Sequence, residues 1–598
     1  MANKYWVASS SQNWNDASYW SLTSGGTGGV TPPGNTDNAI FDSNGVGDCT
    51  LNVSINVLGL LMSSGYTGTI DTSTNDHTII GTLSINDGQL KCNASTITCQ
   101  GDIFIEDSLG LLDAGTSKFY LDGTLNISNK HLGNAFYDVE LSSSAIVTLT
   151  EDHYIEHQFI TNDGSEVKDD GSERQIWFVQ NSDIVNDDGC TWTNSSPGNI
   201  VLHFAQAFDH DISGGNYGTT KIFIDLAAPP DSTVTQTGDV ICGELSVSSG
   251  ASPTYDVNGY DLICTSITMV DRPDGLTFFD AGEGEITVSG NVTIGDNATI
   301  DFESATMNVN GDVLIDSGST VELSSATLNI SGDFTIDSSA TWNLGTGNII
   351  LDGTSLQTVT LNGKQVYNIT VTNKSAQGVF FADGIDVAND LIANADTGNI
   401  LLTFDKDNTH SINEFVLSGS LSYLVQLRSE LDGTQWSVLS NITKNVSRAD
   451  VKDSNLSVAT IVVSLGVDSG NNSSNWVFQT TPVPPFSGSF AALKSIQTVL
   501  TNKNRYSYMI PSGTIVSKVD IFDKNKISYR QNIPVELYFN YSGHWWAYES
   551  GMTDRYGSII FTHSTASVPY ITNCLGIAKA TIDGEEYISN LMRYNFVS

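Results

Sequence analysis

Apolar and polar residues alternate over short segments of this chain, and between about residues 285 and 355 the alternation repeats at a fixed interval. Gly290, Gly311, Gly332 and Gly353 lie 21 residues apart. The apolar positions that keep the same interval are Ile286/Met307/Leu328/Ile349, Val288/Val309/Ile330/Leu351, Val292/Val313/Phe334, Ile294/Ile315/Ile336, Ile300/Val321/Trp342 and Phe302/Leu323/Leu344. Alternation predicts strands with one buried face, and a period near 20 that holds two or three such strands predicts one coil of a solenoid. A single coil cannot cover its own apolar face, so the coils must stack into a rod.

The same unit recurs outside this regular region. Gly81, Gly101 and Gly123 each begin a similar phrase, whereas from about 130 to 240 the period loosens and Asp-rich turns intrude. With 39% hydrophobic and only 15% charged residues, the chain is predicted to be all-β, with a right-handed parallel β-helix over residues 46–478. About 20 coils at a strand spacing of ~4.8 Å would give a rod on the order of 100 Å long.

Both ends of such a rod need closing, because the first and last coils expose apolar edges. Residues 1–45 are predicted to form an N-terminal capping and anchoring module, in which Trp6, Trp14 and Trp20 close the end. At the far end, Trp436 and Trp476, together with Phe478, are the corresponding candidates.

A separate domain is predicted after the rod. Residues 479–488 are a Pro-rich linker, since closely spaced prolines resist helix and ladder pairing. Residues 489–598 return to short alternating segments, which favours a small immunoglobulin-like β-sandwich, although Cys574 stands alone and the Cys–Trp–Cys signature is missing.

His544, Trp545 and Trp546 in this C-terminal domain form a candidate binding tip. Aromatic residues lie beside a turn there, and alternation should bury one tryptophan and expose the other. The exposed ring could stack on a sugar or on a partner protein. The alternative interpretation is that both rings pack in the domain core.

The net charge of the chain argues against one class of partner, the nucleic acids. The chain carries 25 Lys+Arg and 67 Asp+Glu, a net charge of −42. Residues 489–598 hold 10 Lys+Arg and 8 Asp+Glu, so residues 1–488 carry a net charge of −44. A rod this acidic repels phosphate backbones, which excludes nucleic-acid binding.

The Asp- and Asn-rich turns are candidate sites for Ca²⁺ binding. Asp209–Asp211 and Asp468–Asn472 are the clearest clusters, yet no EF-hand loop or calcium-binding nonapeptide repeat occurs. Asp and Asn also satisfy local backbone donors, which explains their place in turns without an ion. We therefore predict no cofactor, with Ca²⁺ as the alternative.

No catalytic or metal-binding residue can be assigned. His153 and His157 belong to an HxxEH sequence, but on a strand they would lie about 13 Å apart, too far to share a zinc ion. The seven cysteines show no metal spacing and are expected to be buried thiols. No carboxylate pair is marked out among the acidic residues, and no phosphate-binding loop or GxSxG elbow occurs, so the protein is predicted to be non-enzymatic.

The N-terminal residues lack an apolar stretch of secretory length, and no run of 18 apolar residues occurs. These features predict a chain that folds in a cytoplasm and does not insert into a membrane.

Three stretches resemble known protein families. The opening Trp14-Asn-Asp16-Ala-Ser-Tyr-Trp20-Ser21 with Asp37 to Phe41, and the closing Val451 with Asp468 to Phe478, resemble the ends of β-helical proteins of tailed bacteriophages. The sequence TDRYGSIIFTHS with GIAKATIDG resembles immunoglobulin-like modules of phage fibre and capsid proteins. The resemblance implies a virion component, often trimeric, and transfers no catalytic residue.

The sequence therefore predicts a structural, non-enzymatic component of a phage virion. Its role would be that of a tail or head fibre, a spike or a capsid decoration protein that serves host attachment or stabilises the particle. The expected partners are other capsid or tail proteins, a host-surface glycan or protein, and two further copies of the chain in a homotrimer. Two alternatives remain: a tailspike-like glycan depolymerase and a bacterial surface adhesin.

Overall fold

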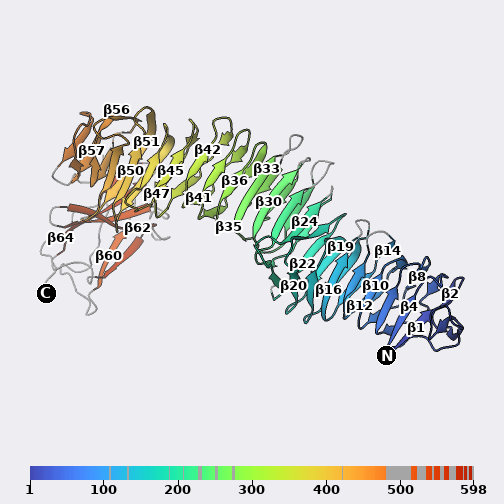
Figure 1. The fold of residues 1–598 in the computed structure, drawn as a ribbon. Coiled ribbons are helices and arrows are strands. Elements are labelled where there is room, and N and C mark those ends of the chain that lie inside the picture. The colour runs from blue at the N-terminus through green and yellow to red at the C-terminus, as the bar shows by residue number, and fades with distance from the viewer. Residues whose placement is uncertain are drawn as a thin grey trace.

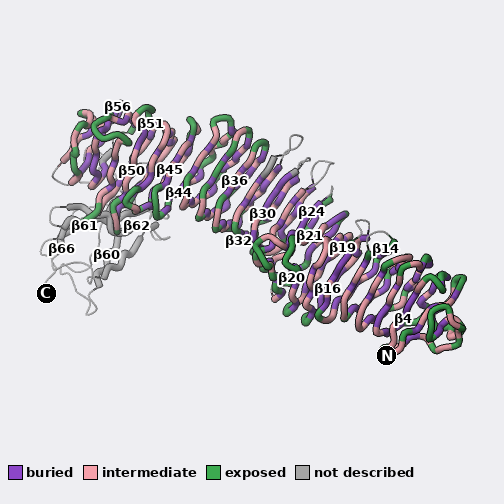
Figure 2. The backbone as a smooth tube through the Cα atoms, in the orientation of Figure 1, coloured by how far each residue is buried: buried purple, intermediate pink, exposed green. Residues whose placement is uncertain are grey.

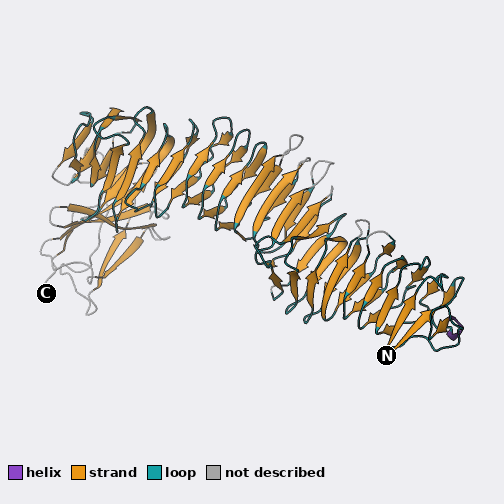
Figure 3. Cartoon of the chain, viewed as in Figure 1, coloured by secondary structure: helices purple, strands orange, loops and turns teal. Residues whose placement is uncertain are grey.

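The structure, a computed structural model, describes residues 1–479 except 107–108, 131–133, 188, 206–207, 226–231, 250–252, 272–276, 421 and 443. Beyond residue 479 it describes the backbone of seven strands between residues 514 and 594. Residues 1–479 form a parallel β-solenoid of about 18 turns, drawn as an elongated stack of coils in Figure 1. Its one described helix is the 3₁₀ turn η1 (Ala17–Tyr19), as Figure 3 shows. The all-β parallel solenoid is thus confirmed, while its right-handed sense stays a prediction.

The 21-residue unit is one coil of three strands. In the regular region the coils are β35 (Glu285–Val288), β36 (Val292–Ile294) and β37 (Ala298–Asp301), then β38 (Thr306–Val309), β39 (Val313–Ile315) and β40 (Thr320–Glu322), then β41 (Thr327–Ile330), β42 (Phe334–Ile336) and β43 (Thr341–Asn343), followed by β44 (Asn348–Leu351). Each strand pairs in parallel with its counterpart one coil later.

Apolar positions that the sequence period aligns are partners in the observed strand pairing. Ile286 is the partner of Met307, Met307 of Leu328, and Leu328 of Ile349. Their side chains are at most 1% exposed. Figure 2 shows buried positions on the strands along the whole rod, while exposed residues gather at the turns. The alternation of the sequence therefore directs aliphatic side chains into one continuous core.

The N-terminal coils use the same three-strand plan in two further sheets, A and B. Sheet A contains β1 (Ala2–Trp6), β4 (Asp37–Phe41), β7 (Gly59–Met62), β10 (Leu83–Ile85), β13 (Ile103–Ile105), β16 (Thr124–Asn129), β18 (Ile146–Leu149), β20 (Glu166–Asp169) and β23 (Thr191–Thr193). Sheet B contains β2 (Gln12–Asn13), β5 (Cys49–Thr50), β8 (Thr69–Asp71), β11 (Gly88–Lys91) and β14 (Gly110–Asp113). Sheet C begins at β6 (Asn56–Val57) and passes through β9 (His77–Ile79), β12 (Thr96–Cys99) and β15 (Lys118–Leu121).

The cross-section of the solenoid changes where the sequence period loosens. Sheet B ends at β14, and the buried side chain of Asn134 takes the place of the next strand. Its Nδ2 donates to the Gly110 carbonyl at 2.9 Å, and its Oδ1 accepts from the Leu112 amide at 2.9 Å. Strand β19 (His153–Thr161) then pairs with both β21 (Arg174–Phe178) and β22 (Asp183–Asn186), so sheet C continues as two columns.

The first of these two columns carries the site described below. It runs through β24 (Ile200–Ala205), β27 (Lys221–Asp225), β30 (Glu244–Ser249) and β33 (Ser266–Asp271) to β36, β39 and β42. Sheet D runs beside it from β26 (Gly215–Asn216) to β59 (Trp476–Gln479).

The predicted glycine period marks a corner where neighbouring coils touch. The Gly311 amide donates to the Gly290 carbonyl at 3.0 Å, and the Gly332 amide donates to the Gly311 carbonyl at 3.0 Å. A Cβ added at Gly311 would lie 2.5 Å from the Gly290 carbonyl oxygen. The glycines are therefore required by the close approach of two backbones.

The three tryptophans predicted to cap the N-terminal end are buried within the first coils of the solenoid itself. Strand β1 joins sheet A in parallel with β4, and β3 (Trp20–Ser21) pairs antiparallel with β1 at the edge of sheet A. Trp6, Trp14 and Trp20 are buried against Phe41, with Trp14 and Trp20 in an edge-to-face contact at 4.6 Å.

At the other end, Trp476 is buried in the last strand of sheet D, and Phe478 is half-buried beside it. Trp436 lies deeper, in β53 (Trp436–Ser440), where its ring stacks on Phe404 at 4.0 Å. It is a core residue of the terminal coils rather than part of their outer closure.

The C-terminal strands pair antiparallel in two sheets. One contains β60 (Thr514–Asp520) and β63 (Ser558–Ser564). The other contains β61 (Pro534–Tyr541), β62 (His544–Met552), β64 (Cys574–Ile582), β65 (Glu585–Ile588) and β66 (Met592–Tyr594). The predicted Pro-rich linker lies outside the described residues. None of the described segments forms a helix that is long and apolar enough to cross a membrane.

Candidate functional site: an aromatic ladder on the outer face

Four aromatic side chains follow one another on the outward face of sheet C, one from each of four coils. Tyr154 of β19 is the register partner of Trp177 in β21, Trp177 of His203 in β24, and His203 of Phe223 in β27. The ring centroids lie 5.8, 3.6 and 4.7 Å apart in that order. We call these four residues the aromatic ladder.

The strand pattern explains why these rings point outward. Trp177 lies between Ile176 and Phe178, both fully buried, and Phe223 lies between the buried Ile222 and Ile224. Successive side chains of a strand point to opposite faces, so the aromatic residue between two core residues must face solvent. Tyr154, Trp177 and Phe223 are half-buried, whereas His203 is held between its neighbours and is 4% exposed.

The solenoid does not need rings at this position. Beyond Phe223 the same register continues through Ser246, Thr268 and Thr293 in the next three coils. Those coils keep the same strand pairing and the same inward core with small hydroxyl residues in place of aromatic ones. The ladder is therefore a local feature of four coils on a scaffold that folds without it.

A second aromatic pair joins β19 to the strand of the preceding coil. The ring of His157 in β19 stacks on Tyr137 of β17 (Phe136–Leu141) at 4.7 Å, with 8° between the ring planes. His157 Nδ1 lies 2.6 Å from Asp138 Oδ1, and the His157 side chain is 44% exposed. The Asp138 carboxylate thus fixes the ring on its stacking partner.

Polar groups border both sets of rings. His203 Nδ1 lies 3.1 Å from Gln175 Oε1. The ammonium of Lys221 lies 5.3 Å from the Phe223 ring centroid and pairs with Glu244 at 3.1 Å. Partial burial, followed by the charge of Asp113, raises the pKa of Glu156. Burial, and then Asp152, raises the pKa of Tyr154. The site therefore combines aromatic surface with hydrogen-bonding groups at its edges.

The HxxEH sequence forms no metal centre. His153 points into the core and is 3% exposed, whereas His157 faces solvent on the same strand. Burial lowers the pKa of His153 to about 3, with a smaller contribution from Arg174. The prediction that the two imidazoles do not share an ion is consistent with this placement.

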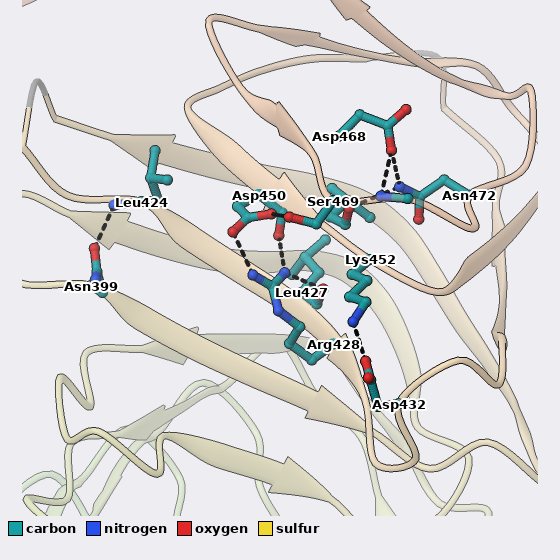
Figure 4. Close-up of polar contacts among 12 residues, drawn as sticks. Asn399, Leu424, Leu427, Arg428, Asp432, Asp450, Lys452, Asp468, Ser469 and Asn472 are labelled. Carbon is teal, nitrogen blue, oxygen red and sulfur yellow. Dashed lines mark hydrogen bonds and ion pairs between the residues drawn. The ribbon is translucent and has the colours of Figure 1, made fainter.

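The acidic turn residues accept backbone hydrogen bonds, some from the following coil and others from within their own turn. Asp312 Oδ1 accepts from the Asp333 amide at 2.8 Å, and Asp209 Oδ1 accepts from the Thr233 amide at 2.9 Å. In the terminal coils, shown in Figure 4, Asp468 Oδ1 accepts from the Gly470 amide and from Asn472 Nδ2. This is the turn chemistry that the sequence suggested, and the role of Ca²⁺ stays a prediction.

Ion pairs join coils in the same region. Figure 4 shows Arg428 paired with Asp450 one coil later, and Ser469 Oγ donating to Asp450 Oδ1 at 2.6 Å. Lys452 pairs with Asp432 across the same step. The charged side chains of these pairs therefore stabilise the contact between neighbouring coils.

Among the residues that the structure describes, one cluster of three carboxylates is close enough together to share an ion. Oxygens of Asp405, Asp407 and Glu430 lie within 4.8 Å of one another. The ammonium of Lys406 already pairs with Asp407 and, at 3.1 Å, with Glu430. Lysine therefore supplies the positive charge at this place.

The cysteines follow the prediction in the described part of the chain. Cys49, Cys92, Cys99, Cys190, Cys242 and Cys264 are free and buried. Burial raises the pKa of Cys99 to about 12, so this thiol is unreactive at neutral pH.

Of the predicted binding tip, the structure describes the backbone alone. His544, Trp545 and Trp546 open strand β62, and each is a register partner of β61. Their side chains lie outside the described residues, so the tip stays a prediction.

Reasoning from the sequence missed the aromatic ladder. Its members are separated by 23, 26 and 20 residues, which hides the periodicity. The available signal was local: an aromatic residue in the polar position of an alternating strand.

Comparisons of the chain with known protein-family models, with curated proteins and with solved structures give no match.

Proposed function

We propose that this chain is a structural and adhesive rod of a phage virion, a fibre, spike or capsid decoration protein that attaches the particle to its host or stabilises it. The observation that carries the proposal is the single core that runs without interruption from Trp6 to Trp476. A core that extends along one axis gives a stiff spacer, and about 18 coils at ~4.8 Å each span about 90 Å.

The resemblance of the two solenoid ends to phage β-helical proteins supports the virion assignment. We further propose that β60–β66 belong to an immunoglobulin-like sandwich, since their antiparallel pairing in two sheets suits that architecture. The partners are other virion proteins, a host-surface component and, by the same resemblance, two further copies of this chain.

Particle composition tests the proposal. Gradient-purified particles from a lysate that contains this gene product should retain the chain in mass spectrometry, and labelled antibodies should mark one fixed place on each particle in negative stain. If the chain stays in the unbound fraction, it is not a virion component.

A glycan depolymerase is the second candidate, favoured by one observation. The pKa of Glu156 is raised by burial and by the nearby charge of Asp113, and a glycosidase needs one carboxylic acid that stays protonated beside an ionised one. Incubation of the purified chain with host polysaccharide should then release new reducing ends, and Glu156→Gln should abolish the release. Without reducing ends in the wild type, the non-enzymatic role stands.

A further inference from the structure

We propose that the aromatic ladder and the Tyr137–His157 stack together form a binding surface for an uncharged polysaccharide chain. The inference rests on the attachment role proposed above, for which it names the ligand class and the residues. It does not require hydrolysis.

The rings offer the kind of surface that a sugar contacts. A pyranose has faces of C–H bonds rimmed by hydroxyl groups, so it combines with aromatic surface at its faces and with polar groups at its rim. Tyr154, Trp177 and Phe223 are half-buried, and the end rings adjoin small residues rather than further rings. Ala135 precedes the register partner of Ile155, and Ser246 is the register partner of Phe223. The outer faces of Tyr154 and Phe223 are therefore not stacked on another ring.

The spacing suits a polymer that runs along the rod. Successive coils are separated by ~4.8 Å, which is close to the length of one sugar unit in an extended chain. Four consecutive coils carry the ladder, and Tyr137 adds the coil before them. An extended chain can thus follow the coils without a change of register and contact the half-buried rings of Tyr154, Trp177 and Phe223, while the buried His203 supports its neighbours.

Hydrogen-bonding groups lie where the hydroxyl rim would be. Gln175 lies beside His203, Asp138 contacts His157, and Glu156 lies between Tyr154 and His157 in the sequence of β19. Carboxylates and amides can each accept from sugar hydroxyls, and Lys221 can donate.

The local charge selects against acidic polysaccharides. Both basic side chains near the ladder are paired: Lys221 with Glu244 at 3.1 Å, and Arg174 with Asp170 at 2.7 Å. The remaining nearby charges include Glu156 and Asp152, on a chain of net charge −42. An anionic chain would therefore be repelled.

A purely structural role for the rings is the competing explanation. Aromatic pairs do stabilise neighbouring strands, by about 0.5–1.5 kcal/mol each. The coils that follow, however, hold the same strands together with Ser246, Thr268 and Thr293 in the same register. The chain itself therefore supplies a substitution that the fold accepts, which makes the two explanations separable.

The test is affinity electrophoresis of the full chain in native gels that contain one polysaccharide each. Mannan, galactomannan, dextran and a soluble β-glucan are the uncharged probes, and alginate is the anionic one. We expect at least one uncharged polysaccharide to retard the wild type and alginate to leave its mobility unchanged. Trp177→Thr, which introduces the residue of the later coils, should weaken retardation at least tenfold. Trp177→Phe, which keeps a ring, should stay within about threefold of the wild type.

Trp342→Ala is the matched control. Trp342 is also half-buried, but its ring packs near Phe334 at 6.1 Å, away from the ladder, so retardation should not change. Thermal unfolding of each variant reports the fold separately. The proposal is overturned if no uncharged polysaccharide retards the wild type, if Trp177→Thr binds as well as the wild type, or if alginate alone binds. Particle composition tests the virion role independently, so either idea can fail while the other holds.

Discussion

Replacing Gly311 by alanine tests the account of the glycine corner. The added Cβ would lie 2.5 Å from the Gly290 carbonyl oxygen and 2.2 Å from Asn291 Oδ1. The first contact is with backbone, which cannot rotate away, so two coils must separate locally. Overpacking of this kind costs about 1–3 kcal/mol. The backbone of Gly311 is not left-handed, so the cost comes from the close approach alone.

Hydrogen exchange measured by mass spectrometry is the suitable assay, because long repeat arrays do not unfold in a single two-state step. Exchange reports the free energy of local opening. A loss of about 1–3 kcal/mol corresponds to roughly 5- to 150-fold faster exchange. We expect the acceleration in peptides that cover β36 to β42, with little change in the N-terminal coils.

Gly34→Ala is the control within the same chain. A Cβ at Gly34 meets no atom within 4 Å, and the backbone there is not left-handed. This substitution should be neutral or should stabilise by about 0.4–1 kcal/mol through the unfolded state. Equal exchange in Gly311→Ala and the wild type, or equal acceleration in both variants, would refute the steric explanation.

Three further predictions follow from side chains. Asn134→Ala removes the two hydrogen bonds that end sheet B and leaves the buried Gly110 carbonyl and Leu112 amide without these partners. The loss should lower local stability by about 2–4 kcal/mol, so limited proteolysis should cut near β14. Unchanged protection would contradict this role. The pKa of His153 is about 3 in the folded chain and about 6.5 in the unfolded chain. Below about pH 6.5 the unfolded chain binds a proton that the buried imidazole does not, so the free energy of unfolding falls, by about 2–3 kcal/mol at pH 4.5. Thermal unfolding of His153→Leu should lose this part of the acid sensitivity, and a pH profile identical to that of the wild type would count against it. Asp256, Asp280, Asp301 and Glu322 are neighbours in register, and burial together with Asp256 and Asp301 raises the pKa of Asp280. The stability that the protonated Asp280 contributes is therefore lost as the pH rises through its raised pKa. Asp301→Asn removes one of the neighbouring charges, so it should raise the unfolding temperature at neutral pH but not below about pH 4. A gain that persists in acid would exclude charge repulsion as its cause.

The regular coils could be predicted from sequence because one physical constraint repeats without change. Ile286, Met307 and Leu328 occupy the same register in successive coils, so a 21-residue period and a period-two alternation suffice to place them. The burial of Trp6, Trp14 and Trp20 was equally accessible, since the first coil of a solenoid must be closed.

The middle of the rod could not be predicted in this way. Sheet B stops because the side chain of Asn134 bonds the backbone of β14, and nothing in the sequence pattern distinguishes this asparagine from those in turns. Strand β19 pairs with two later strands, β21 and β22, and its pairing with β17 contains a register shift. Both features break the period on which the prediction depends. The aromatic ladder lies in this region, so its alignment became visible only in three dimensions.

The carboxylates and amides in the turns bind each coil to the next one by the same contact. Asn291 accepts from the Asp312 amide, Asp312 from the Asp333 amide and Asp333 from the Thr358 amide. Removing or duplicating one complete unit, such as residues 312–332, would leave the amide at each step of this series with an Asn or Asp acceptor. The reach of the molecule can therefore change in steps of ~4.8 Å by insertion or deletion of whole units, so relatives that differ in length by multiples of 21 residues are compatible with an unchanged core.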